Sequence, residues 1–135
     1  MKDMKNRSGC PVSCSLEVWG DKWSLLIIRD LMLNKQYTYS EFLNADESIS
    51  TNILAARLLA LEENGLITKS TNPHNKSSTL YSLTQKGIDL LPTLVEIHLW
   101  ADKYLDISDD KKSLLQEIKS DKNAFILKSK KYLQS

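Results

Sequence analysis

Two cysteines lie four residues apart near the N-terminus, in the segment GCPVSC at residues 9–14. Because the thiolate is the reactive form, they could act as a redox pair, a nucleophile or half of a metal site. Pro11 suits a first helical turn, which makes Cys10 the residue that caps the helix. Free N–H groups and the helix dipole then lower the pKa of Cys10. Cys14 could resolve an oxidised Cys10, pair with another subunit or be buried.

The remaining reactive side chains do not assemble into a catalytic or metal site. His74 falls on a polar hairpin tip, and His98 falls in an apolar helix, where a structural role suits it better than that of a base. The cysteines and histidines lack the C-x₂-C and paired-histidine spacing of zinc sites. The sequence also lacks a glycine-rich phosphate loop and an HExxH motif. We therefore expect no enzyme, no catalytic residue, no metal and no cofactor.

Helical patterns dominate the elements that must position these residues. Asp21 is a good N-cap for the helix DKWSLLIIRDLML, which places Arg29 and Asp30 opposite its apolar side. That side is formed by Trp23, Leu26, Ile27, Leu31 and Leu33. A helix from Pro11 to Gly20 precedes it, and a brief strand at residues 37–38 with a short helix at residues 40–44 follows. Trp23 and Trp100 suit a core or an interface.

The next elements form a helix and a hairpin. Ser50 caps the helix 50–64, in which Leu54, Leu58 and Leu61 form one apolar stripe and Gly65 is the stop signal. The period then changes, and short alternating segments at residues 67–83 predict a hairpin with a polar tip.

A long helix is expected at residues 85–105, capped by Thr84 and kinked before Pro92. It carries two apolar stripes, and the second stripe requires a second partner, which favours a homodimer. The stripes are formed by Ile88, Leu91 and Val95, and by Leu90, Leu94 and Ile97. One or two further helices are expected after Ser108, the second around residues 124–132.

This order predicts a winged helix-turn-helix fold, mainly α-helical with a small β-hairpin wing. The helix 50–64 presents small or polar side chains at Asn52, Ala55 and Ala56 opposite its apolar stripe. Small side chains let a helix enter the major groove of DNA. Asn75, Lys76 and Ser77 suit the wing for phosphate or minor-groove contact.

Individual residues can be assigned to DNA on this basis. Arg57 suits a phosphate or a base edge, and the alternative is a salt bridge to Glu62, Glu63 or the preceding helix. Those two glutamates would be repelled by phosphate, so only the N-terminal half of the helix is expected in the groove. The other candidates are Ser50 at a phosphate, Thr51, Asn52 and Ala56 at base edges, Lys22 at a helix start, and Asn75 and Lys76 in the wing.

Overall charge does not indicate the partner, and composition predicts only the compartment. The net charge is +1, so overall charge is silent about nucleic acid, and the placement of local charges must decide. The sequence has only two cysteines, and no apolar run is long enough to span a membrane. No apolar segment follows the basic start. We therefore expect a cytoplasmic protein without a signal peptide.

Five segments in order make the chain recognisable as similar to a known family. They are CPV…LEVWGDKWSLLIIRDL, YSEFLN, SISTNILAARLLALEENGLI, LYSLTQKG and LLPTLVEIHLWA. Together they resemble the HxlR-type winged helix-turn-helix regulators, a bacterial group related to the MarR regulators. The resemblance covers residues 10–101, within an expected domain at 1–105 followed by a helical extension at 106–135.

The resemblance implies a homodimeric DNA-binding regulator that dimerises through its N-terminal and long C-terminal helices and reads DNA with the helix 50–64. It matches Arg57 and Lys22 to family positions, and Cys10 to the cysteine that senses oxidants or electrophiles in redox-responsive members. The wing departs from the family, because Ser78 and Leu80 stand where arginine and glutamate are usual, and Ser48 replaces a glycine. The alternative function is a winged-helix module that binds a protein rather than DNA.

Overall fold

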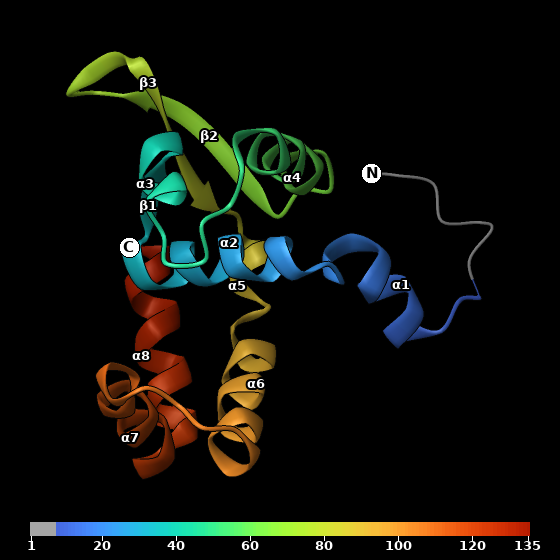
Figure 1. Ribbon diagram of the computed structural model, residues 1–135, viewed down its shortest axis with the longest axis vertical. Coiled ribbons are helices and arrows are strands. Elements are labelled where there is room, and N and C mark those ends of the chain that lie inside the picture. The colour runs from blue at the N-terminus through green and yellow to red at the C-terminus, as the bar shows by residue number, and fades with distance from the viewer. Residues whose placement is uncertain (1–7) are drawn as a thin grey trace. The chain divides into compact units, whose positions relative to one another are not determined.

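The computed structural model describes residues 8–135, and its contacts divide the chain after Gly87 into two compact units (Figure 1). Each unit is described by itself below. The basic start at residues 1–7, which predicts no signal peptide, lies outside the described residues. Within residues 8–135, no helix has the length and apolar character needed to cross a bilayer.

The first unit holds five helices and three strands among its described residues. They are α1 (Pro11–Trp19), α2 (Lys22–Asn34), β1 (Gln36–Thr38), α3 (Tyr39–Leu43), α4 (Thr51–Glu63), β2 (Ile67–Asn72), β3 (Asn75–Leu83) and α5 (Gln85–Ile88), whose last residue belongs to the second unit.

Local signals fix the ends of these helices. The carboxylate of Asp21 accepts hydrogen bonds from the backbone N–H groups of Trp23 and Ser24, which caps α2. Thr38 and Glu41 form a capping box at α3. Gly65 follows α4 with φ +78°, a conformation that glycine adopts without strain. The predicted N-cap of α2 and the predicted stop of α4 are therefore confirmed.

The strands form one antiparallel sheet in the order β1-β3-β2. Tyr37 of β1 lies opposite Tyr81 of β3, and Ile67 of β2 lies opposite Leu83 at the other side of β3. The hairpin predicted at 67–83 is thus confirmed, and it projects beside α4 (Figure 1). Its tip differs from the prediction, because the turn is at residues 73–74 and Asn75 already begins β3.

The core of this unit lies where α2, α3 and α4 meet the sheet. Ile28 and Leu31 of α2, Phe42 of α3, and Leu54 and Leu61 of α4 are all buried. Burying each of these side chains contributes roughly 1.5–3 kcal/mol relative to leaving it exposed. Removal of that apolar surface from water holds α4 against α2, and so fixes which side of α4 faces outward.

The apolar side predicted for α2 is wrong at two positions. Asp30, expected opposite the apolar side, is only 8% exposed, and Leu33, expected on that side, is 53% exposed. Asp30 is buried because its carboxylate pairs with Arg29, so its burial is compensated electrostatically. A prediction from helical periodicity places a charged residue on the exposed side, because it does not take an ion-pair partner such as Arg29 into account.

The second unit consists of α6 (Leu91–Tyr104), the 3-10 turn η1 (Asp109–Lys111), α7 (Lys112–Ser120) and α8 (Lys122–Gln134). Leu115 and Ile118 of α7 and Leu133 of α8 are buried, and the three helices pack on one another. The two tail helices are confirmed. The expected division at 105/106, and a tail packed on a dimer, stay predictions.

The single long helix predicted at residues 85–105 is wrong. The chain forms α5, leaves the helix at residues 89–90, and begins α6 at Leu91 with Pro92 in its first turn. Proline lacks a backbone N–H and is best tolerated in the first turn of a helix. Pro92 therefore starts a helix here instead of kinking one.

Candidate nucleic-acid interface

Side chains around the start of α4 cap this helix and hold its first turn against α3. The Oγ of Ser50 accepts a hydrogen bond from the N–H of Ile53 at 3.3 Å, as expected of an N-cap. The hydroxyl of Tyr39 in α3 donates to the carbonyl oxygen of Thr51 at 2.8 Å. This bond joins α3 to the first turn of α4, so the two helices of the predicted helix-turn-helix are tied where the second one begins.

The outer face of α4 is small and exposed. Asn52, Ala55 and Ala56 are all exposed, opposite the buried leucine stripe. Thr51, at the first position of the helix, is exposed as well. Thr51, Asn52 and Ala56 therefore lie together on an open surface that a groove could receive.

Arg57 lies at the flank of that surface. Its Nε is 3.4 Å from Oδ1 of Asp21, the residue that caps α2, and its side chain is 41% exposed. The structure therefore shows the kind of ion pair weighed as the alternative for Arg57, with Asp21 rather than Glu62 or Glu63 as the partner. Contact with DNA remains a prediction, and the outer edge of a guanidinium is free for phosphate when Nε faces a carboxylate.

The electrostatics of this pair favour the charged forms. Burial alone would raise the pKa of Asp21, but hydrogen bonds from Ser24, the charge of Arg57 and the N–H of Trp23 together hold it below its ordinary value. Asp21 is therefore ionised at neutral pH, when it both caps α2 and holds Arg57.

Lys22 is exposed in the first turn of α2, directly beside Asp21. Its ammonium nitrogen lies 4.6 Å from the centre of the Trp23 ring, a cation–π contact. Lys22 follows Asp21 in the chain and Arg57 pairs with Asp21, so both cations belong to a candidate phosphate site at the start of α2.

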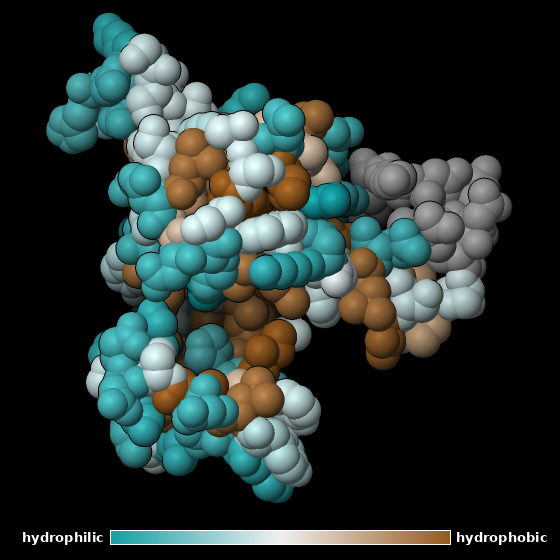
Figure 2. Space-filling view, in the orientation of Figure 1, coloured by the Kyte–Doolittle hydropathy of each residue, from teal (hydrophilic) through white to brown (hydrophobic). Residues whose placement is uncertain are grey.

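The hairpin contributes the second flank. Asn75 and Lys76 are exposed at the start of β3, and Oδ1 of Asn75 accepts hydrogen bonds from the N–H and the hydroxyl of Ser77. Lys69 of β2 lies 3.7 Å from Glu62, which joins the hairpin to α4. Figure 2 shows the far end of the hairpin in hydrophilic colours. The predicted wing residues are therefore accessible.

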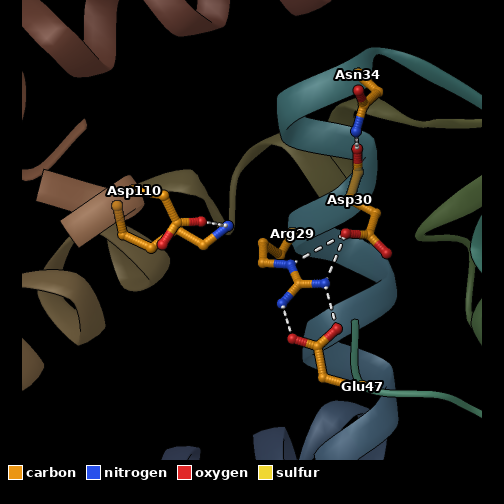
Figure 3. A network of polar contacts seen from close by, with 6 residues as sticks. Arg29, Asp30, Asn34, Glu47 and Asp110 are labelled. Carbon is orange, nitrogen blue, oxygen red and sulfur yellow. Dashed lines mark hydrogen bonds and ion pairs between the residues drawn. The ribbon is translucent and has the colours of Figure 1, made fainter. Parts of the chain in front are cut away.

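Arg29, Asp30 and Glu47 form a charged network between α2 and the turn before α4 (Figure 3). This network was not foreseen from the sequence. The guanidinium of Arg29 donates to both carboxylate oxygens of Glu47, at 2.7 and 2.9 Å, and to Oδ1 of Asp30, at 3.0 and 2.7 Å. The hydrogen bonds to Glu47 outweigh the cost of burial and raise the pKa of Arg29. Glu47 lies in the turn between α3 and α4, so Arg29 ties that turn to α2. The only signal in the sequence was a pair of adjacent charges within an apolar helix.

A hollow of about 400 Å³ lies between α1, the start of α2 and the C-terminal half of α4. Its charged lining consists of Glu17, Asp21, Arg57 and Glu63. The Arg57–Asp21 pair is therefore open to solvent on this side. Within residues 8–135, no three histidine, cysteine or acidic side chains gather where they could hold a metal ion.

Cys10 caps α1 as expected. It is exposed and free, with Pro11 in the first turn after it. The backbone N–H groups of Ser13 and Val12 lower the pKa of its thiol, because they stabilise the thiolate. Cys14 is half-buried and also free, and its N–H donates to the carbonyl oxygen of Cys10 at 2.9 Å.

The two histidines differ in their surroundings. His74 is exposed in the turn of the hairpin, and Nδ1 of His98 lies 2.7 Å from the carbonyl oxygen of Leu94 in its own helix. The ring of His98 is therefore engaged with backbone, in line with the structural role expected for it.

Comparisons with known proteins agree with this geometry. The family model described as HxlR-like helix-turn-helix matches residues 18–109. An HTH-type transcriptional regulator of Synechocystis sp. is 31% identical over 106 residues, which cover 78% of each chain. The HTH-type transcriptional regulator YodB of Bacillus subtilis is 31% identical over 101 residues, covering 74% of this chain and 89% of YodB.

Solved structures match as well. The reduced form of YodB has a TM-score of 0.60 at 30% identity, covering 74% of this chain and 98% of that one. YodB has also been crystallised bound to quinone and after treatment with diamide. The redox regulator HypR in its oxidised form has a TM-score of 0.64 at 28% identity, covering 73% of this chain and all of HypR. The mainly helical fold with a small antiparallel sheet is therefore confirmed.

Proposed function

The chain belongs to the HxlR-like helix-turn-helix family of transcriptional regulators. On this premise we propose that it works as a homodimer on a near-palindromic operator, with α4 in the major groove and the hairpin 67–83 as the wing. The observation that carries the proposal is the outer face of α4, which is exposed, carries the small side chains of Ala55 and Ala56, and has no carboxylate until its last turn. Such a face can approach the floor of a groove about 12 Å wide.

The first two turns of α4 read the bases. Asn52 can pair bidentately with adenine, and Thr51 and Ala56 lie on the same open surface. Ser50 caps the helix next to the phosphates. Glu62 and Glu63 belong to the last turn, so they stay outside the groove, where the phosphates would repel them.

Cations on both flanks of α4 contact the DNA backbone. Lys22 and Arg57 approach one strand from the start of α2, and Asn75 and Lys76 approach the other from the wing. Because neutralised phosphates release counterions, affinity falls by about 0.9 in log units per contact for each tenfold rise in salt. Near-zero net charge does not prevent this, since these residues are concentrated around one helix.

Apolar surface outside the DNA-contacting helix supports dimerisation. In α1, Val12 and Leu16 are exposed and no residue of the helix is buried, and Figure 2 shows hydrophobic side chains over α1. In α6, Ile97, Trp100 and Tyr104 are exposed and repeat at helical spacing. Faces of this kind are normally covered by another chain.

Cys10 senses oxidants or electrophiles in this proposal. It is exposed, and the amides at the start of α1 favour its thiolate, the form that attacks an electrophile. YodB bound to quinone and treated with diamide, and HypR in its oxidised form, are precedents among the similar structures. If Cys10→Ser leaves the response of DNA binding to diamide unchanged, the thiol has no such role, while DNA binding itself stands.

Selection of bound DNA from genomic fragments tests the proposed function. The purified protein is mixed with fragments at low and at high salt, with and without diamide. We expect reproducible recovery of fragments that share an inverted repeat, with retention lost at high salt. A chain that only binds proteins would retain no fragment reproducibly under either condition.

A further inference from the structure

The helix α4 is apolar on its outside as well as on its inside. Leu59 is 56% exposed and Ile53 is 37% exposed, and both lie near the exposed Ala55 and Ala56. A helix on the surface of a folded protein normally carries polar residues on its outer face. Before its last turn, the uncharged polar residues of α4 are Thr51 and Asn52, both in its first turn. This face is therefore suited to being covered.

Charge indicates what covers it. From Thr51 to Leu61, α4 carries no acidic residue, and its one charged side chain there is Arg57 at the flank. Cations also lie at the start of α2 and in the wing. An apolar strip between cations matches the major groove, where thymine methyl groups line the floor and phosphates form the rims.

We propose that Leu59, with Ala55 and Ala56 beside it, reads the 5-methyl groups of thymines in the operator. This inference rests on the proposed function and extends the base contacts by one turn, beyond the N-terminal half of α4 that was expected in the groove. Leu59 lies seven residues after Asn52, which is two helical turns and about 10.5 Å along the axis. With a rise of about 3.4 Å per base, the thymine under Leu59 lies about three base pairs from the base that Asn52 contacts.

Exchange of thymidine for deoxyuridine tests this contact directly, because it replaces one methyl group in the major groove by hydrogen and keeps the base pair. The probe is a duplex recovered by the wild-type protein from a random DNA library, remade with single exchanges along the half-site. We expect one or two exchanges to weaken binding about fourfold each, which corresponds to about 0.8 kcal/mol per buried methyl. The other exchanges should leave the Kd unchanged.

Leu59→Ala is the matching change in the protein. Because the side chain is exposed and alanine favours helix, the fold should be intact. We expect this variant to bind the thymidine and deoxyuridine duplexes equally, so that the fourfold difference disappears. Leu33→Ala, which removes an equally exposed leucine from α2, is the control and should keep the wild-type difference.

Three outcomes would overturn the inference. If the wild type binds all single-exchange duplexes equally, the methyl contact does not exist, while recovery of the duplex still supports the proposed function. A fourfold difference that persists in Leu59→Ala assigns the methyl contact to other residues. A Leu59→Ala variant that becomes smaller in sedimentation and loses both duplexes equally places Leu59 in a protein contact. Failure to recover any duplex would instead contradict the proposed function itself.

Discussion

At the scale of single residues, Arg57 has two possible partners, the carboxylate of Asp21 and a phosphate of DNA. In the free protein it pairs with Asp21, whose charge is maintained at neutral pH. A guanidinium has five N–H donors in a planar fork, so Nε can stay with Asp21 while the outer donors reach a phosphate. Under the proposed function, the ion pair orients Arg57 toward a phosphate and does not compete with that contact.

Arg57→Ala should weaken operator binding by roughly ten- to a hundredfold, because a hydrogen bond to a charged group contributes about 1.5–3 kcal/mol. The slope of log affinity against log salt should fall by about 0.9, the value for one phosphate. Titration of labelled operator at several salt concentrations measures both. Lys128→Ala, which removes a cation paired with Glu117, is the control and should change neither quantity. An unchanged slope in Arg57→Ala would rule out the phosphate contact.

Cys10 gives a prediction about pH. Its pKa is lowered by the amides of Ser13 and Val12, so its thiolate is present at lower pH than that of an ordinary cysteine. In a Cys14→Ser background, the rate of alkylation by iodoacetamide should reach half its maximum below the ordinary range of about 8.5–9. The same protein unfolded in urea is the reference. A midpoint that does not move on unfolding would show that the helix start has no effect on the thiol.

At the scale of elements, the turn between α3 and α4 depends on a side chain from α2. Arg29 binds both oxygens of Glu47 in that turn and also compensates Asp30, whose side chain is 12% exposed. In the same turn, Ser48 adopts φ +58°, where the resemblance makes glycine usual. The Arg29–Glu47 pair therefore ties this turn, with the left-handed backbone of Ser48, to α2.

Arg29→Met should lower the free energy of unfolding by about 2–4 kcal/mol, because it leaves Asp30 buried without its cation. Glu47→Gln should cost less, about 1 kcal/mol, since its amide can still accept a hydrogen bond and the side chain is more exposed. Urea unfolding followed by circular dichroism measures both.

Lys119→Met provides the comparison for this network. It breaks the pair with Asp102, in which both side chains are substantially exposed, and such a pair contributes at most about 1 kcal/mol. If Arg29→Met were no more destabilising than Lys119→Met, the network of Arg29, Asp30 and Glu47 would be an ordinary surface contact.

At the scale of the whole molecule, the proposed dimer must place two copies of α4 on one operator. A symmetric dimer places its recognition helices one turn of DNA apart, roughly 34–36 Å. The apolar side chains exposed on α1 and on α6 provide surface for that association.

Five base pairs inserted between the half-sites should reduce operator affinity at least tenfold, because the second half-site is rotated by about half a turn. Sedimentation of the protein with the unmodified duplex should show two chains per DNA. Equal affinity for both spacings, or one chain per duplex, would contradict the symmetric dimer and leave a monomeric regulator.

The sequence by itself determined the elements and their order. N-caps at Asp21 and Ser50, the stop at Gly65 and the alternation of the hairpin are read within a few residues, because capping and periodicity are local interactions. These signals were sufficient for the winged helix-turn-helix fold and for the exposed surface of α4. They failed at Pro92, where the same residue is compatible with either a kink or a helix start.

Only the tertiary structure decided the partners of the charged residues. Arg29 meets Glu47 eighteen residues later, and Arg57 meets the cap of α2, because the packing of α2 against α4 brings them together. It likewise decided that Asp30 is buried and that Leu33 and Leu59 are exposed. Such pairings follow from the relative positions of whole helices, which residue types and spacing along one helix do not specify.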